Sequence, residues 1–323
     1  MAFRFRIRFL LALFAAALVC VTMADSAIAQ EHGAHAAPAA HAAAPGRGDA
    51  HGGDEHHTLS LKAVELFHIG KFTITNSMLV TWIVALLIIG FAQYATRNIK
   101  PVPTGAQNFW EWLVEGLYEF LGGVIGSDLV KRTFWFFATT FIFILTLNWF
   151  GLIPGVGTIG WGHTSPTTGT FIVDRALLRG ANADLNLTFA MACVFFVLWI
   201  VWAVQMNGPG GVLVHIFGPK GKSTGFLKVL LLVIFFLVGV LEVVSILFRP
   251  ISLSFRLYGN VYAGEVMLES MAAVAPKFLT WLVPTPFYFL ELLVGLVQAL
   301  VFMLLTGVFT LLIAPHDPAH EHH

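Results

Sequence analysis

The chain has 323 residues and a formal net charge of zero, with 57% hydrophobic and only 11% charged residues. Soluble domains carry roughly 25% charged residues, so this composition excludes an ordinary soluble protein and indicates no nucleic-acid partner. Several apolar runs approach the roughly 20 residues that a helix needs to cross a bilayer. We therefore predict an all-α polytopic membrane protein.

Residues 1–29 have the features of a signal peptide. Three arginines precede the apolar run 9–21, and Ala27-Ile28-Ala29 then provides a small-x-small cleavage motif. Cleavage would place the mature N-terminus in the periplasm. An uncleaved signal anchor is the alternative, and in both cases the segment is separate from the membrane domain.

Low-complexity sequence follows. We predict a disordered Ala/Gly/His-rich periplasmic arm over 30–70, a membrane domain over 71–315 and a disordered His-rich cytoplasmic tail over 316–323. The histidines of the arm have no fixed ligand spacing, so a solvated tether is favoured over a metal site. The only cysteines, Cys20 and Cys193, lie in apolar runs and indicate no disulfide framework.

A first span is predicted over about 76–94. Arg97 and Lys100 follow it, and the positive-inside rule places this end in the cytoplasm. In residues 109–121, apolar residues recur at helical spacing opposite a stripe of glutamates at 111, 115 and 119. This pattern predicts an interfacial amphipathic helix on the cytoplasmic surface.

Two further spans are predicted over 134–154 and 185–204, joined outside the membrane by a Gly-rich loop at 155–170. Basic residues before the first span and after the second agree with the positive-inside rule: Lys131, Arg132, Lys220, Lys222 and Lys228. This part of the chain therefore crosses out and back.

The apolar stretch 226–275 would form a helix of about 75 Å, more than twice the hydrocarbon thickness. We expect one long, strongly tilted helix that crosses once and turns near 276–286. A final helix over about 287–314 then returns to the cytoplasm. The prediction is about five crossings and one interfacial helix, with the last two helices forming a tilted hairpin.

The stretch "FRPISLSFRLYGNVYAGE" at 248–265 carries Arg249, Arg256 and Glu265 within this apolar region. One charge at the bilayer centre costs about 3 kcal/mol on insertion scales, so these charges indicate a functional site. At 100° per residue, Glu242, Arg249 and Arg256 share one helix face.

Further polar residues extend this set. Asn260 lies one turn beyond Arg256 on the same face, whereas Glu265 and Glu269 lie on the opposite side, and Glu291 and Gln298 share a face of the final helix. Together they favour a proton path, because burial disfavours an ionised carboxyl and lets it hold or pass a proton.

Three structural alternatives remain open. Arg256 and Glu265 could form a static ion pair, although their opposite faces disfavour it. Arg249 could snorkel to an interface, since it lies beside a proline. Glu269 or Glu291 could be protonated and merely hydrogen-bonded.

The run "RPISLSFRLYGNVYAGE" resembles the signature of ATP synthase subunit a, in which an essential arginine precedes Leu, an aromatic residue, Gly-Asn and then Ala-Gly-Glu. Three further motifs resemble that family in the expected order: "LNWFGLIP" at 147–154, "ADLNLT" at 183–188 and "LVQALVFMLLT" at 296–306. The resemblance covers roughly residues 60–315.

The resemblance implies a role for each polar position. Arg256 matches the stator arginine that faces the carboxylate of the rotating c-ring, and Glu265 and Glu291 match positions lining the periplasmic half-channel. Gln298 matches the glutamine near the arginine, Glu242 a carboxylate toward the cytoplasmic exit, and Asn260 a polar lining residue, with Arg249 and Glu269 as secondary candidates. Many relatives carry histidine where Glu291 stands, so the relay here would run from carboxylate to carboxylate.

The resemblance also implies the setting. The partners would be the c-ring, the subunit b or b/b′ peripheral stalk, the remainder of ATP synthase and membrane lipids, in a bacterial inner membrane. We expect a non-catalytic subunit without a cofactor, since the sequence has no nucleophile motif, phosphate loop or metal motif. A proton-coupled or metal-handling transporter is the alternative, disfavoured because no internal repeat is evident and nearly all histidines lie in the tails.

Overall fold

The computed structural model describes residues 65–69, 72–156, 158–164, 171–217, 226–276, 278–279 and 281–314. They form, in chain order, β1 (Glu65–Ile69), β2 (Phe72–Thr75), α2 (Asn76–Thr96), α3 (Ala106–Ile125), α4 (Ser127–Gly151), β3 (Gly160–Thr164), β4 (Phe171–Ala176), the 3-10 helix η1 (Ala181–Ala183), α5 (Leu185–Phe217), α6 (Phe226–Val274) and α7 (Thr285–Leu311). The predicted signal peptide, the arm up to residue 64 and the tail 316–323 lie outside the described residues.

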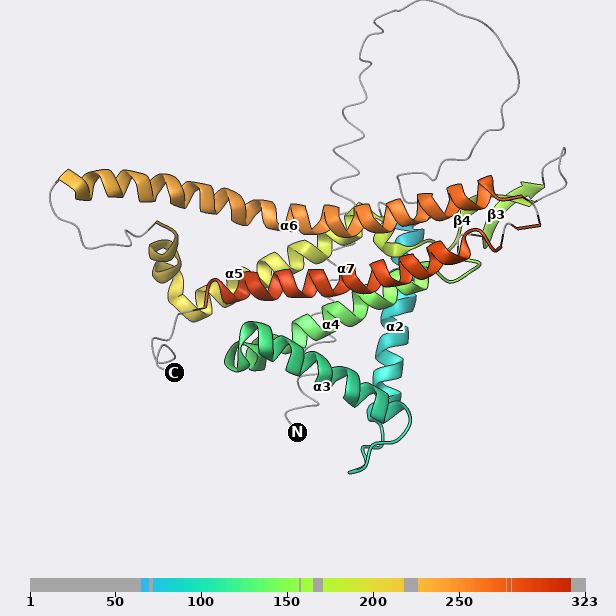
Figure 1. Cartoon of the computed structure of the whole chain (residues 1–323), viewed down its shortest axis with the longest axis horizontal. Coiled ribbons are helices and arrows are strands. Elements are labelled where there is room, and N and C mark those ends of the chain that lie inside the picture. The colour runs from blue at the N-terminus through green and yellow to red at the C-terminus, as the bar shows by residue number, and fades with distance from the viewer. Residues whose placement is uncertain are drawn as a thin grey trace, which may run out of the picture.

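Five of these helices are long and apolar enough to cross a membrane: α2, α4, α5, α6 and α7. This confirms the predicted all-α polytopic fold with five crossings. In Figure 1, α6 and α7 run close to a common axis, α4 and α5 run obliquely to them, and α2 stands more steeply. The core forms where these helices meet, and its fully buried residues include Phe137, Phe195, Leu257 and Phe302.

Helix α6 is a single helix of 49 residues that includes Pro250. At 1.5 Å per residue it is about 75 Å long, so the structure has the single long helix that was predicted and not two separate spans. Proline removes one backbone hydrogen bond, but neighbouring helices allow it inside membrane helices. The chain then turns between residues 275 and 284, and α7 begins at Thr285, which completes the predicted hairpin.

The predicted amphipathic helix is α3, which lies across the ends of α2 and α4 (Figure 1). Its buried residues Leu117, Leu121 and Ile125 recur at helical spacing and join the core beside α4 and α7. Gly126 ends α3 and precedes α4 with a φ of 84°, a conformation that suits glycine because it has no Cβ. This residue therefore permits the sharp turn from the surface helix into the next crossing.

Two features differ from the sequence prediction. Helix α5 extends to Phe217, across a kink at Gly208 that precedes Pro209, whereas its span was expected to end near residue 204. Two antiparallel hairpins, β1 with β2 and β3 with β4, flank the spans where no strand was predicted. Strand β4 reads FIVDRA, whose β-branched and aromatic residues favour extended backbone, but six residues are too few to establish a strand pattern from the sequence.

Candidate functional site

The polar centre of the molecule lies where α6 meets α7. Glu291 of α7 is buried, with 6% of its surface exposed, in a helix that is otherwise almost entirely apolar. Its carboxyl group lies against Gly264 of α6, and a Cβ at that position would overlap the carboxyl. The glycine before Glu265 therefore provides the space that lets Glu291 approach α6.

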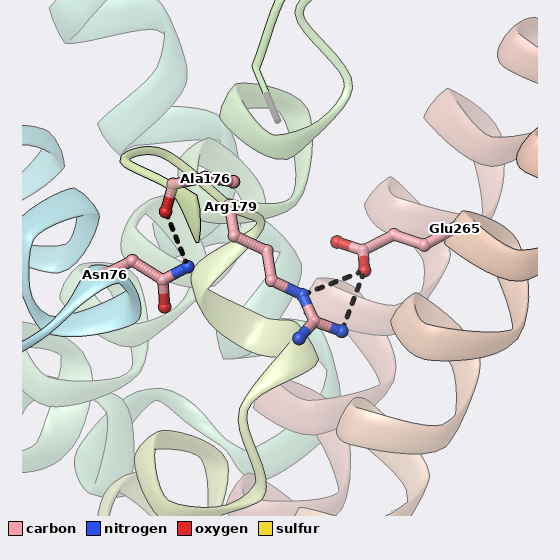
Figure 2. Close-up of polar contacts among 4 residues, drawn as sticks. All are labelled: Asn76, Ala176, Arg179 and Glu265. Atoms are coloured by element: carbon pink, nitrogen blue, oxygen red, sulfur yellow. Dashed lines mark hydrogen bonds and ion pairs between the residues drawn. The ribbon is translucent and has the colours of Figure 1, made fainter. Parts of the chain in front are cut away.

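Glu265 of α6 has a partner that the sequence analysis missed. Nε and Nη2 of Arg179, which follows β4, each donate to Glu265 Oε2 at 3.4 Å. Figure 2 shows the guanidinium reaching from the loop before η1 toward the helix that carries the carboxyl. The side chains retain only 10% and 19% exposure, so this charge pair is largely shielded from water.

Asparagine side chains join α4, η1 and α7 beside this pair. Asn182 Nδ2 donates to Asn148 Oδ1 at 2.7 Å, and Asn148 Nδ2 donates to the Gly295 carbonyl at 2.9 Å. Gly295 is also closely packed, since a Cβ there would lie 3.0 Å from the Asn148 Cβ. The "LNWF" motif and the residue just before "ADLNLT" thus meet at one buried polar contact.

Two buried amide oxygens, Asn76 Oδ1 and Asn182 Oδ1, have no hydrogen-bond partner among the described residues. Asn76 begins α2, and its Nδ2 donates to the Ala176 carbonyl at 3.2 Å (Figure 2). Buried polar atoms are almost always satisfied by protein or ordered water. These oxygens are therefore two unused hydrogen-bond acceptors in the region between α2, α4 and η1.

Asp184, which follows η1, lies in the same region. Ser77 Oγ donates to Asp184 Oδ2, and the Asn186 backbone N–H donates to Oδ1 at 3.0 Å. Asp184 is buried with 8% exposure, so these donors compensate its removal from water. The polar region thus continues from Glu265 and Glu291 toward the start of α2.

On the Arg256 side of Glu265, a hydrogen bond joins α6 to α7. Asn260 Nδ2 donates to Gln298 Oε1 at 2.6 Å, and Gln298 is buried with 4% exposure. Asn260 itself is exposed. The structure therefore brings together Glu265, Glu291, Gln298 and Asn260, which the sequence analysis selected on two separate helices.

Arg256 lies one turn before Asn260 and is exposed on the surface of α6. It has no hydrogen-bond or ion-pair partner in the part of the chain that the structure describes. Asn260, four residues further along α6, is exposed on the same face. The cation is therefore exposed on a helix apolar enough to cross a membrane, and Glu265 is paired with Arg179 instead.

The other candidate charges lie elsewhere on α6. The Arg249 guanidinium lies over the rings of Phe309 and Trp199, 4.4 and 5.5 Å from their centroids, rather than extending along the helix to an interface. Glu242 is half-buried and lies seven residues before Arg249, and Glu269 is exposed one turn beyond Glu265. Neither carboxyl belongs to the contacts between α6 and α7 described above.

Chemically, the arrangement offers a row of groups that can hold or relay protons. Along α6, Glu265 and Arg256 are nine residues apart, about 14 Å at 1.5 Å per residue, with the Asn260–Gln298 contact between them. A carboxyl can take up and release a proton, whereas a guanidinium stays charged at accessible pH. Acid groups and a fixed cation therefore lie along one stretch of helix.

The family description "ATP synthase A chain" matches residues 78–310, which is most of the chain. The chain belongs to this family. The match includes every residue of the polar centre from Asn148 to Gln298, so the resemblance predicted from four motifs is confirmed over residues 78–310.

Individual relatives support the same family assignment. The chain is 34% identical over 252 residues to ATP synthase subunit a of Trichlorobacter lovleyi, covering 78% of this chain and 92% of the relative. It is 32% identical over 246 residues to ATP synthase subunit a of Moorella thermoacetica, covering 76% of this chain and 94% of the relative. It is also 32% identical over 248 residues to that of Solidesulfovibrio magneticus, covering 77% and 87%.

Sequence reasoning missed Arg179, Asn148, Asn182, Asp184 and Ser77. Asn148 and Asp184 lie in the "LNWFGLIP" and "ADLNLT" motifs, which were used only to support the family, and Asn182 directly precedes the second motif. Polar residues inside or beside an apolar span were the available signal, and asking which partner each requires would have selected them. Arg179 lies outside the predicted spans and offered no such signal.

Proposed function

We propose that this chain carries protons in the membrane sector of ATP synthase and couples their flow to rotation of a ring of c subunits. In this proposal Arg256 is the stator arginine, Glu265 and Glu291 line the access path from the periplasm, and Glu242 lies toward the exit to the cytoplasm. The single observation that carries the proposal is the exposed Arg256 on an apolar membrane helix. Such a charge needs a partner from another molecule.

The partner's chemistry follows from that charge. A carboxyl on a rotating subunit can pass through lipid only when it is protonated, because the ionised form loses several kcal/mol of solvation. Arg256 would hold an arriving carboxylate in its ionised form. Since arginine does not release its proton, it also prevents direct proton transfer between the two access paths.

Proton uptake would use the buried centre between α6 and α7. Glu291 and Glu265 lie at neighbouring positions, and the Asn260–Gln298 contact continues toward Arg256. The buried amide oxygens of Asn76 and Asn182 support water on the outer side of these carboxyls. Each proton that crosses would contribute about 2.3 kcal/mol per 100 mV of membrane potential.

The test is Arg256→Ala in the complete ATP synthase, in inverted membrane vesicles. ATP-driven proton pumping should be lost although the c-ring still copurifies with the chain. Glu291→Gln should slow pumping without abolishing it. Ser252→Ala, at another exposed position of α6, is the control and should pump normally. Normal pumping by Arg256→Ala would refute the proposal.

A further inference from the structure

We propose that Arg179 is a positioning residue for proton entry. Its guanidinium holds the Glu265 carboxylate in place and in the ionised form, so that Glu265 can accept each arriving proton and then pass it to the Glu291 carboxylate. The inference rests on the role given to Glu265 in the proposed function and deepens it, because it names the group that keeps this carboxylate ready to accept a proton. Arg179 lies in the loop before η1, outside the five membrane-spanning helices.

Two neighbouring residues of that loop contact the two oxygens of the Glu265 carboxylate. Nε and Nη2 of Arg179 donate to Oε2 at 3.4 Å, and Figure 2 shows the guanidinium aimed at the carboxylate. The other oxygen lies against Gly180, where a Cβ would be only 2.5 Å from Oε1. A larger residue at position 180 would push the carboxylate away from the guanidinium. The Arg-Gly pair therefore provides both the charge and the space that this carboxylate needs.

Hydrogen bonds on both sides fix the backbone that carries Arg179. Before it, the Ala176 carbonyl accepts from Asn76 Nδ2 of α2 at 3.2 Å (Figure 2). After it, Asn182 Nδ2 donates to Asn148 Oδ1 of α4 at 2.7 Å. The loop is thus tied to two membrane helices. A cation on such a loop is already in position when the charge on the carboxyl changes, so it acts without a cost of reorganisation.

The surroundings of Glu265 explain why a cation is needed there. Its side chain keeps only 19% exposure, and a carboxyl removed from water favours the protonated form. Glu269 and Glu291 add negative charge near Glu265, whereas Arg179 adds positive charge. A carboxyl that never released its proton would stop transport. The guanidinium therefore allows Glu265 to exchange protons although it is largely shielded from water.

The other titratable groups around the pair do not supply this charge. They lie on α6, after η1 and on α7, and are Tyr258, Tyr262, Glu269, Asp184 and Glu291. Asp184 accepts hydrogen bonds from Ser77 and from the Asn186 backbone. Tyrosines are ordinarily neutral near pH 7, and the other three groups are acids. Among these described groups and Arg179, the arginine alone is positive at neutral pH.

The first experiment measures ATP synthesis by the complete ATP synthase in liposomes, with the catalytic sector outside. Membrane potential and outside pH are held constant, and the inside pH, on the side from which protons enter, is varied. Each variant yields two quantities, the maximal rate and the inside pH that gives half of it. Amounts of assembled complex are matched.

Removal of the cation should make Glu265 hold its proton more tightly. Arg179→Gln should therefore lower the maximal rate several-fold and raise the half-maximal inside pH by about one unit or more. Arg179→Lys keeps the charge and should keep the half-maximal pH of the wild type. Arg97→Gln removes an exposed arginine outside this site and should match the wild type in both quantities.

A second experiment detects the proton directly. Infrared difference spectra of the purified complex at neutral pH should show an additional protonated carboxyl band in Arg179→Gln compared with the wild type. The double variant R179Q/E265Q should lack this band. The measurement does not depend on proton transport, so it tests the effect of Arg179 on Glu265 whatever the outcome of Arg256→Ala.

Three results would overturn the inference. An unchanged half-maximal pH in Arg179→Gln would mean that Arg179 only fastens the loop to α6. The same shift in Arg179→Lys as in Arg179→Gln would show that the charge is not the cause, and absence of a Glu265-dependent infrared band would show that the carboxylate stays ionised without its partner. Normal pumping by Arg256→Ala would instead refute the proposed function and leave the infrared prediction intact.

Discussion

Arg249 and Arg256 are seven residues apart on α6, and helical spacing places them on one face. The two arginines nevertheless differ in burial and in partners. Arg249 is half-buried, with its guanidinium over the rings of Trp199 on α5 and Phe309 on α7. Arg256 is exposed, without an ion-pair or hydrogen-bond partner in the described residues.

The difference arises from which helices cross α6 at each point. At Arg249, α5 and α7 both approach, and the Trp199 indole N–H donates to the Phe309 carbonyl at 2.9 Å, which ties them together. At Arg256 no described side chain provides a partner. The first cation therefore joins three helices of this chain, whereas the second is available to another molecule.

The largest effect is expected when each arginine is replaced by lysine. In the proposed contact with the c-ring, which removes this position from water, lysine would release its proton far more readily than arginine, so Arg256→Lys should reduce coupled ATP synthesis by about a hundredfold or more. Arg249→Lys keeps a cation near the two rings and should retain most activity. ATP synthesis by the two variants is measured in vesicles with matched amounts of assembled complex. Equal losses of activity would show that the two arginines do not differ in function.

Removing one member of the Arg179–Glu265 ion pair should lower the stability of the complex. Arg179→Ala leaves Glu265 without its cation, and should destabilise the complex by about 2 kcal/mol, less than the 3–5 of a fully buried pair because Glu265 keeps 19% exposure. Adding Glu265→Gln to Arg179→Ala should restore part of the assembled protein. The yield of intact complex after detergent extraction measures this, and no rescue would argue against the pair as the cause.

Packing around the polar centre gives a third comparison. Gly264→Ala places a Cβ into the Glu291 carboxyl, so we expect a cost of about 1–3 kcal/mol and proton pumping slowed several-fold. Gly259→Ala, on the same helix, meets no atom within 4 Å and should change stability by less than about 0.5 kcal/mol. Pumping rates at equal protein level test the pair of variants. Similar rates would show that Glu291 can move aside.

The smallest effect concerns the rings around Arg249. Trp199→Phe keeps a ring but loses the hydrogen bond to Phe309, a cost of about 1 kcal/mol. Trp199→Leu also loses the cation–π contact and should cost roughly 1 kcal/mol more. Thermal unfolding of the purified complex distinguishes them. Equal shifts would mean that the ring contributes nothing beyond its hydrogen bond.

Much of the fold followed from hydrophobic patterning alone. The spans near 76–94 and 134–154 were placed within a few residues at most ends, and the amphipathic helix was recognised from Leu117 and Leu121 opposite its glutamates. The site was predicted in part. Glu265 and Glu291 stood out as charges in apolar runs, but Arg179 did not, because its pairing depends on a loop folding back onto α6.

The sequence by itself determined the crossings, the family and the polar positions on α6 and α7, because lipid requires apolar helices and makes each buried charge conspicuous. Tertiary structure alone decided which charges meet. Spacing along one helix gives angles about its axis, but the partner of a side chain depends on neighbouring helices that lie far away in sequence. Hence Glu265 contacts Arg179 and Arg249 contacts two aromatic rings, whereas Arg256 forms no ion pair with a carboxylate of the described residues.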